Sequence, residues 1–363
     1  MILINKLITK CGKNIELKDL VDEFYLKLSR TQSNRAKRFF LQRVKLNLAS
    51  IIDSKKKQEF IRVIKRDHSI LLKSDPTVLK SKIDDYERLG YNTLLFDDSA
   101  NKGRGKQTIF GGLIEDLFGY GTFRDGPHAI WLAEQLNIKT CPYCNAQYTL
   151  TYSKNVDPTF FKTLFKSNER EKERALFEFD HFFPKSRYPY LSTSIYNLVP
   201  ACKPCNNLKG SAKTDLLNYV HPYQRDFNKM FEFDCSDKDV IDFLLSKKKI
   251  EDVEVILKSR KSGTFKVTLK NHIELFDLDK IYQLHKDVVE ELYLKSYYYN
   301  STRQKELLEI KITGTNKNLF TKEVLARFIL GNYALDEDIN KRPLSKMTKD
   351  IAEKIHILDF MKK

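Results

Sequence analysis

The sequence predicts an α+β protein in which a short strand–loop–strand–helix core is flanked by a helical N-terminal region and a C-terminal region of mixed strands and helices. Apolar residues recur at three- and four-residue steps through residues 17–89, which is typical of amphipathic helices. Two strand-like stretches and a helix-like stretch follow one another within residues 177–219. Residues 253–269 alternate apolar and polar side chains around a Ser-Gly turn, which predicts a β-hairpin. A long helix is expected over residues 279–310.

These patterns divide the chain into four regions. Residues 1–96 form the helical N-terminal region. Residues 97–124 are expected to be a linker or loop, because their first part is polar, contains glycine and lacks periodicity. Residues 125–225 hold the core with its paired cysteines, and residues 226–363 form the mixed C-terminal region.

The charge of the chain favours a polyanionic partner. Its 64 Lys and Arg residues exceed the 48 Asp and Glu residues, which gives a net charge of +16. Nucleic acid is the first candidate partner and an anionic membrane surface the second. The alternative is that the excess positive charge reflects only a lysine-rich coding background and no partner. The start lacks the apolar stretch of a signal peptide, and no 18-residue apolar run exists. We therefore expect a cytoplasmic protein without a membrane span.

Four of the six cysteines form two Cys-x-x-Cys pairs, Cys141/Cys144 and Cys202/Cys205. Each pair makes a tight knuckle that points two thiolates at one ion, so together they predict a tetrahedral zinc site. A closed four-thiolate set leaves no position for water, and the Zn²⁺ is therefore expected to be structural. Both knuckles contain Pro and are followed by Asn, which argues against two unrelated cysteine pairs.

The polar residues of the core resemble those of the HNH endonuclease family, which has a ββα-metal fold. Asp180 and His181 are followed by Asn197 and then by a Cys-x-x-Cys-Asn that ends at Asn206. The resemblance implies that His181 is the general base and that Asn197 holds the loop that orients it. It also implies that Asp180 and Asn206 bind a catalytic Mg²⁺ or Mn²⁺. Asn206 stands where the name-giving pattern has a final His, and an amide oxygen suits a hard ion.

The same residue types suit phosphodiester hydrolysis. A neutral imidazole accepts the proton of the attacking water near pH 7, and a divalent ion neutralises the phosphate. Lys209 follows Asn206 by three residues on the expected helix, so both can face the cleft. Lys185 and Arg187 follow the first strand. These three basic residues are expected to bind nucleic-acid phosphates, and His221 either joins the site or is a structural histidine.

A wider set of stretches resembles the PtuB-like nucleases of Septu-type anti-phage systems, which are bacterial HNH proteins associated with ATPases. These stretches are CPYC, FDHFFPKSRYPYLS, NLVPACKPCN, HPY and INKRPLSKMTKDI. The resemblance implies a separate ATPase partner, and the chain has no Walker-type phosphate loop of its own. We therefore predict a metal-dependent DNA endonuclease. The alternatives are an HNH nuclease that cleaves RNA or tRNA, a non-catalytic zinc-stabilised subunit that binds nucleic acid, and a structural subunit of a defence complex.

Overall fold

The chain divides into two compact units, which are described separately. The computed structural model describes residues 4, 6–8, 14–31, 53–100, 105–152, 174–260 and 263–361. We call residues 4–138 and 149–224 the N-terminal unit, and residues 139–148 and 225–361 the C-terminal unit. Within the described part of the chain, no helix has the length and apolar character needed to span a membrane.

The N-terminal unit is mostly helical and contains four two-stranded antiparallel sheets among its described residues. Its helices are α1 (Leu17–Thr31), α3 (Lys55–Lys73), α4 (Pro76–Arg88), α5 (Asn92–Leu95), α6 (Ile109–Leu117), α7 (Tyr120–Arg124), α8 (Pro127–Leu136) and α10 (Lys203–Lys209). Its strands pair as β1 (Lys6–Ile8) with β2 (Asn14–Glu16), β3 (Phe96–Asp97) with β4 (Lys106–Gln107), β5 (Thr151–Tyr152) with β6 (Arg174–Ala175), and β7 (Glu178–His181) with β8 (Leu198–Ala201).

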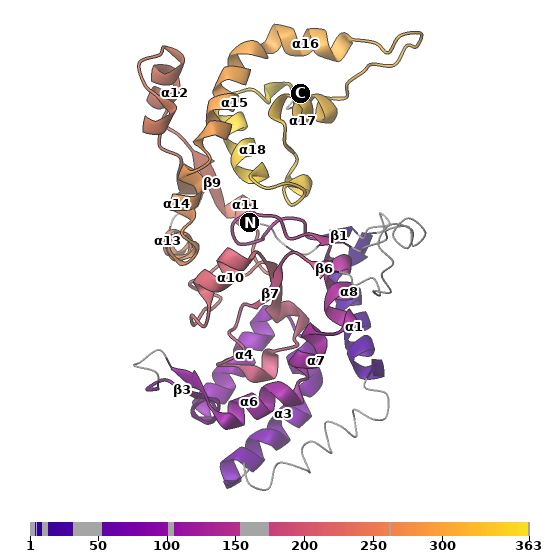
Figure 1. The fold of residues 1–363 in the computed structure, drawn as a ribbon, viewed down its shortest axis with the longest axis vertical. Helices are drawn as coiled ribbons and strands as arrows, with labels where there is room; N and C mark the ends of the chain where they lie inside the picture. The colour runs from indigo at the N-terminus through magenta and orange to yellow at the C-terminus, as the bar shows by residue number, and fades with distance from the viewer. Residues whose placement is uncertain are drawn as a thin grey trace, which may run out of the picture. The chain divides into compact units, whose positions relative to one another are not determined.

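The helices of this unit support the loop between β7 and β8. Helix α3 is capped by Ser54, whose hydroxyl accepts a hydrogen bond from the Lys57 backbone N–H at 3.3 Å. Its buried stripe includes Phe60, whose ring centroid lies 6.0 Å from that of Tyr190. Tyr190 belongs to the 3₁₀ turn η1 (Pro189–Leu191), which α3 and α6 both contact. Helices α3 and α6 are labelled in the lower part of Figure 1. The apolar stripe predicted for residues 17–89 therefore packs directly against the loop of the strand pair.

The C-terminal unit combines one strand pair with a group of helices. Strand β9 (Phe231–Asp234) pairs antiparallel with β10 (Ile256–Ser259). The helices are α11 (Phe227–Met230), α12 (Asp237–Leu244), α13 (Thr264–Phe276), α14 (Leu278–Gln283), α15 (Lys286–Tyr298), α16 (Ser301–Glu309), α17 (Lys322–Leu330) and α18 (Ser345–Lys354). Helix α18 packs on β9, where Asp350 accepts a hydrogen bond from Phe233 N and forms a buried ion pair with Lys346 at 2.5 Å. The predicted α+β class, with a helical N-terminal region and a mixed C-terminal region, is confirmed.

The structure corrects the prediction that residues 97–124 form a linker. Residues 109–124 form α6 and α7. Thr108 caps α6 by accepting a hydrogen bond from Gly111 N at 2.9 Å, and the helix buries Phe110 and Ile114. These apolar residues lie at helical spacing, and their burial outweighs the glycine content that suggested a linker.

Two predictions for the C-terminal region are also wrong. Among the described residues of the expected hairpin, only 256–259 form a strand, and its partner is β9 rather than residues 265–269. Residues 265–269 lie on α13, because Leu269 and Phe276 also fit the helical repeat and are buried. The expected helix over 279–310 is instead divided into α14, α15 and α16.

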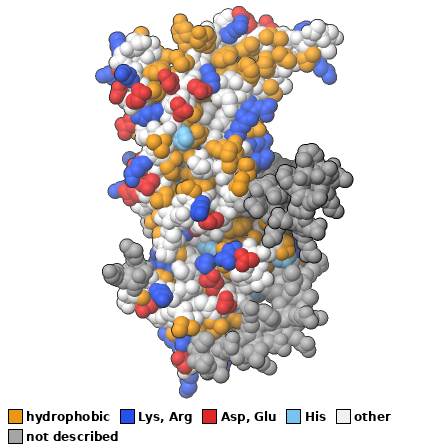
Figure 2. Space-filling model, in the orientation of Figure 1, with side chains coloured by type: hydrophobic (Ala, Val, Ile, Leu, Met, Phe, Trp, Pro, Cys, Tyr) orange, Lys and Arg blue, Asp and Glu red, His pale blue; other side chains and the backbone are white. Residues whose placement is uncertain are grey.

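The described surface carries charges of both signs. On the face shown in Figure 2, Lys and Arg side chains lie among Asp and Glu side chains rather than in one continuous patch. Elsewhere among the described residues, exposed charges also pair with the opposite sign, such as Lys73 with Asp22 at 2.6 Å. The net charge alone therefore does not identify a nucleic-acid surface on this face.

Candidate active site

The predicted core is present as β7, β8 and α10. Strands β7 and β8 pair antiparallel, with Asp180 opposite Val199 and His181 opposite Leu198. Helix α10 begins directly after Cys202, shortly past the end of β8. Adjacent residues of a strand point to opposite faces, so Asp180 and His181 contact different neighbours.

His181 is held by the loop that follows β7. Its Nε2 lies 2.8 Å from the carbonyl oxygen of Ser192. A carbonyl only accepts, so Nε2 carries the proton and Nδ1 is the basic nitrogen. Burial lowers the pKa of His181 to about 3, the positive charges of Lys185 and Lys209 act in the same direction, and the Ser192 hydrogen bond opposes them. The imidazole is therefore neutral at pH 7.

Asp180 points toward α10 and forms a buried ion pair. Its Oδ1 lies 3.0 Å from Lys209 Nζ, and the two side chains are 3% and 1% exposed. Lys209 Nζ also donates a hydrogen bond to the His181 carbonyl oxygen at 2.6 Å. The structure thus places Lys209 inside the site against the carboxylate, not on the surface of α10.

Asn206 and Asn197 each bond to a different part of the core. Asn206 Nδ2 donates a hydrogen bond to Glu178 Oε2 at 2.5 Å, which links α10 to the start of β7. Asn197 is fully buried; its Oδ1 accepts from Phe183 N at 2.7 Å, and its Nδ2 donates to the carbonyls of Phe183 and Leu191 at 3.0 and 3.1 Å. The Asn197 side chain therefore connects two parts of the loop between the strands, at Phe183 and at Leu191.

The two basic residues of the loop are paired with acids from the segment before the core. Lys185 Nζ lies 2.6 Å from Glu115 Oε1 and 5.0 Å from the centroid of the Tyr120 ring. Arg187 lies 2.7 Å from Asp98 Oδ1, and its guanidinium is 4.1 Å from the centroid of an aromatic ring, that of Phe96. Both side chains are near the strand pair but are engaged by neighbouring carboxylates.

His221 lies in an aromatic cluster. Its ring centroid is 4.1 Å from that of Phe182, and its Nδ1 accepts a hydrogen bond from Tyr223 N at 3.2 Å. Burial lowers its pKa to about 3, and the positive charge of Lys209 adds to this effect. Its Nε2 has no hydrogen-bond partner in the described part of the chain. The structure therefore favours the structural interpretation of this histidine.

The first cysteine knuckle is tied to the C-terminal segment by Asn145. This buried residue has a left-handed backbone conformation, with φ of 52°, which Asn tolerates better than most residues. Its Nδ2 donates to Thr140 Oγ1 and to the Ile339 carbonyl at 3.0 Å each, and its Oδ1 accepts from Lys346 N at 3.0 Å. The Asn after the knuckle thus connects it to residues 339–346.

The four predicted zinc ligands are close together. Their ligand atoms lie within 4.8 Å of one another, and all four cysteines are buried. Sulfur atoms around a tetrahedral Zn²⁺ are about 3.8 Å apart, given Zn–S bonds of about 2.3 Å, so this set fits zinc. It is the only group of three or more His, Cys, Asp or Glu ligand atoms found near one another in the residues that the structure describes. The cluster comprises Cys141, Cys144, Cys202 and Cys205.

Sequence reasoning missed three residues near the predicted site. Tyr120 packs against His181 with ring centroids 4.7 Å apart, and its burial raises its own pKa to about 12. It lies in the segment assigned to a linker, so no signal pointed to it. Ser192 contributes only a backbone carbonyl, which sequence does not reveal. Glu178 could have been found, because it precedes Asp180 by two residues and shares its face of the strand.

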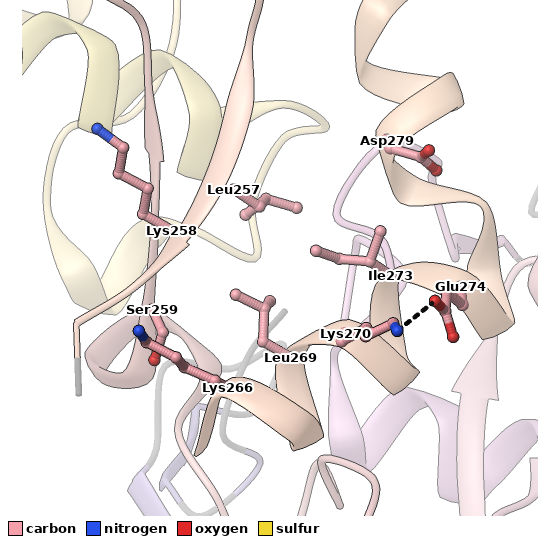
Figure 3. Close-up of a pocket in the computed structure, with 9 residues that line it drawn as sticks. All are labelled: Leu257, Lys258, Ser259, Lys266, Leu269, Lys270, Ile273, Glu274 and Asp279. Carbon is pink, nitrogen blue, oxygen red and sulfur yellow. Dashed lines mark ion pairs between the residues drawn. The ribbon is translucent and has the colours of Figure 1, made fainter. Parts of the chain in front are cut away.

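The C-terminal unit contains a separate pocket of about 600 Å³ (Figure 3). Strand β10 and helices α13 and α14 line it, with Leu257, Leu269 and Ile273 among the apolar residues. Its charged residues have both signs, and Lys270 and Glu274 form an ion pair at 3.7 Å. None of the predicted site residues lies in this pocket.

Comparison with known proteins agrees with the geometry of the core. Residues 167–212 match the HNH endonuclease family. A stretch of 73 residues is 36% identical to the Septu protein PtuB of Bacillus thuringiensis, which covers 19% of this chain and 28% of that protein. The chain thus matches less than a third of the length of this curated relative, and no solved structure matches it. The chain therefore carries an HNH endonuclease domain at residues 167–212, and β7, β8 and α10 all lie within it.

Proposed function

We propose that this chain is a metal-dependent endonuclease that hydrolyses DNA phosphodiester bonds, with His181 as the general base. The observation that carries the proposal is the hydrogen bond from His181 Nε2 to the Ser192 carbonyl. It directs the protonated nitrogen into the protein and leaves Nδ1 to accept a proton from water. The water oxygen then attacks phosphorus and its proton moves to Nδ1. The bond to the 3′ oxygen breaks, that oxygen takes up a proton from solvent, and Nδ1 releases its proton to solvent.

The oxygen donors at the strand–helix interface fit a hard divalent cation. Asp180 supplies a carboxylate and Asn206 an amide oxygen, and these ligand types suit Mg²⁺ or Mn²⁺. The Lys209 ammonium lies 3.0 Å from Asp180, so this carboxylate already stabilises a positive charge. When bound, the ion would neutralise charge on the phosphate and on the leaving oxygen. Lys185 and Arg187 are proposed to bind the flanking phosphates.

The four cysteines are proposed to hold a structural Zn²⁺. Their burial and the proximity of their ligand atoms support this role, and four thiolates leave no position for a reacting water. We further propose that the protein acts in the cytoplasm, as the nuclease subunit of an anti-phage defence system with a separate ATPase. The similarity to the Septu protein PtuB supports that assignment. Co-purification of tagged protein with an ATPase from its native host tests it.

Cleavage of supercoiled plasmid tests the catalytic proposal. The zinc-loaded protein is incubated with the plasmid in Mg²⁺, in Mn²⁺ or in EDTA, beside His181→Ala and the control His285→Ala. His285 lies directly before α15, outside the HNH domain. We expect metal-dependent nicking or linearisation that is lost in His181→Ala and retained in His285→Ala.

The same design separates the alternatives. If the protein cleaves RNA or tRNA but not the plasmid, the proposed substrate changes from DNA to RNA, and His181 remains the proposed base. Salt-sensitive binding without cleavage of either substrate would favour a nucleic-acid-binding subunit. Cleavage that survives His181→Ala would refute the proposed base.

A further inference from the structure

Two pairs of side chains connect β7 with α10. Glu178 and Asp180 are two residues apart on β7 and share one face of the strand. Asn206 and Lys209 are three residues apart on α10 and share one face of the helix. Glu178 binds Asn206 at 2.5 Å, and Asp180 binds Lys209 at 3.0 Å.

The first pair determines which end of the Asn206 amide faces Glu178. An ionised carboxylate only accepts hydrogen bonds, so the amide turns its Nδ2 toward Glu178 Oε2. Its Oδ1 then points the other way, and it has no hydrogen-bond partner within the described ranges of the chain. Only the oxygen of an amide can bind a hard cation, because the nitrogen lone pair is delocalised. Without an acceptor at this position, the amide could present either end.

We propose that Glu178 is a positioning residue that fixes the Asn206 amide with its oxygen available to the divalent cation. This inference rests on the proposed metal site and adds a residue that does not contact the ion. Ser192 acts on His181 in the same way, since its carbonyl determines which imidazole nitrogen is protonated. Both orientations follow from an acceptor that cannot donate.

Mn²⁺ binding tests the proposal without reference to cleavage. The background is zinc-loaded His181→Ala, and free Mn²⁺ is measured by electron paramagnetic resonance. Partners that orient metal ligands typically contribute 10- to 100-fold in affinity. We therefore expect Glu178→Ala to weaken Mn²⁺ binding about tenfold. Glu178→Gln can donate as well as accept, so it fixes the amide less firmly, and its loss should lie between that of Glu178→Ala and none. Glu178 is exposed, so Trp131 fluorescence is expected to show unchanged folding.

A double variant separates orientation from electrostatics. Asn206→Asp replaces the amide by a carboxylate, which has oxygen at both ends and needs no orientation. In that background, Glu178→Ala is expected to change Mn²⁺ binding by less than about threefold. Glu115→Ala is the charge-matched control, because Glu115 and Glu178 both act on the pKa of Tyr120 but Glu115 bonds Lys185 and Gln107. It should not reproduce the tenfold loss.

Four results would overturn the inference. Equal losses from Glu178→Ala in the presence and in the absence of Asn206→Asp would show an electrostatic effect or direct ligation. A tenfold loss in Glu115→Ala would lead to the same conclusion. Binding that requires Asp180 and Asn206 but not Glu178 would refute the positioning role alone, whereas binding indifferent to Asp180→Ala would refute the proposed metal site as well.

Discussion

Removing one partner of the buried Asp180–Lys209 pair should strongly destabilise the N-terminal unit. The atoms are 3.0 Å apart, and both side chains are almost fully excluded from solvent. At this distance the Coulomb attraction is about 5.5 kcal/mol for an effective dielectric constant of about 20. Breaking a buried pair on one side typically costs about 3–5 kcal/mol, because the remaining charge stays buried. We expect Asp180→Ala and Lys209→Met each to lower the free energy of unfolding by this amount.

The double variant should recover much of that loss. With Asp180→Ala and Lys209→Met combined, no unpaired charge is buried at this position. We expect the sum of the single losses to exceed the loss of the double variant by about 3 kcal/mol. Asp84→Ala is the matched control, since Asp84 pairs with Lys80 on the exposed surface of the same unit, and should cost less than about 1 kcal/mol.

Fluorescence of Trp131 measures this unit selectively. Trp131 is the single tryptophan of the chain and lies on α8 in the N-terminal unit. Its ring stacks on Phe24 with centroids 6.3 Å apart, so unfolding exposes it. With a urea slope of about 3 kcal/mol/M, a loss of 3 kcal/mol shifts the midpoint by about 1 M. A shift below about 0.3 M in Asp180→Ala, or a double variant as unstable as the summed singles, would refute the reasoning.

Three further perturbations probe the zinc site, the buried histidine and the loop. Cys202→Ser should lose its bound zinc, and zinc content equal to wild type by elemental analysis would contradict the four-thiolate assignment. His221 has a folded pKa near 3, so the unfolded chain binds more protons below its ordinary pKa of about 6.5, and stability falls as pH decreases. Between pH 7 and pH 5 this lowers the free energy of unfolding by about 2 kcal/mol, and in His221→Phe, measured by urea unfolding at both pH values, this fall should be smaller by about the same amount. Asn197→Ala leaves the backbone N–H and carbonyl of Phe183 unpaired and should lower the free energy of unfolding by about 3 kcal/mol in the same assay; a loss below about 1 kcal/mol would show that water replaces the amide.

The sequence identified residues that belong to motifs whose members lie close together along the chain. The Cys-x-x-Cys spacing indicated which thiolates gather, and the strand–loop–strand–helix order around Asp180 was recognisable. The contacts of Lys209 with Asp180 and of Lys185 with Glu115 depend on tertiary packing across many residues, which spacing does not encode.

The errors in secondary structure have a related cause. Residues 109–124 form two short helices that themselves contain glycine, and burial of their apolar residues outweighs the weak local signal. Residues 265–269 fit both the two-residue and the helical repeat. Strand β9, which lies outside this segment, pairs with residues 256–259, so residues 265–269 are not needed as its strand partner and fold as part of α13.

The pairing register of β7 with β8 makes the chemistry sensitive to single-residue insertions. With Asp180 opposite Val199, the carboxylate pairs with Lys209 of α10, and the imidazole of His181 bonds to the Ser192 carbonyl. A shift by one residue would exchange the two faces and separate the acid from its helix. The loop is also constrained, because residues 188–195 are buried and the Ser192 carbonyl binds His181. Length variation should therefore be tolerated at the partly exposed residues 185–187 rather than within either strand.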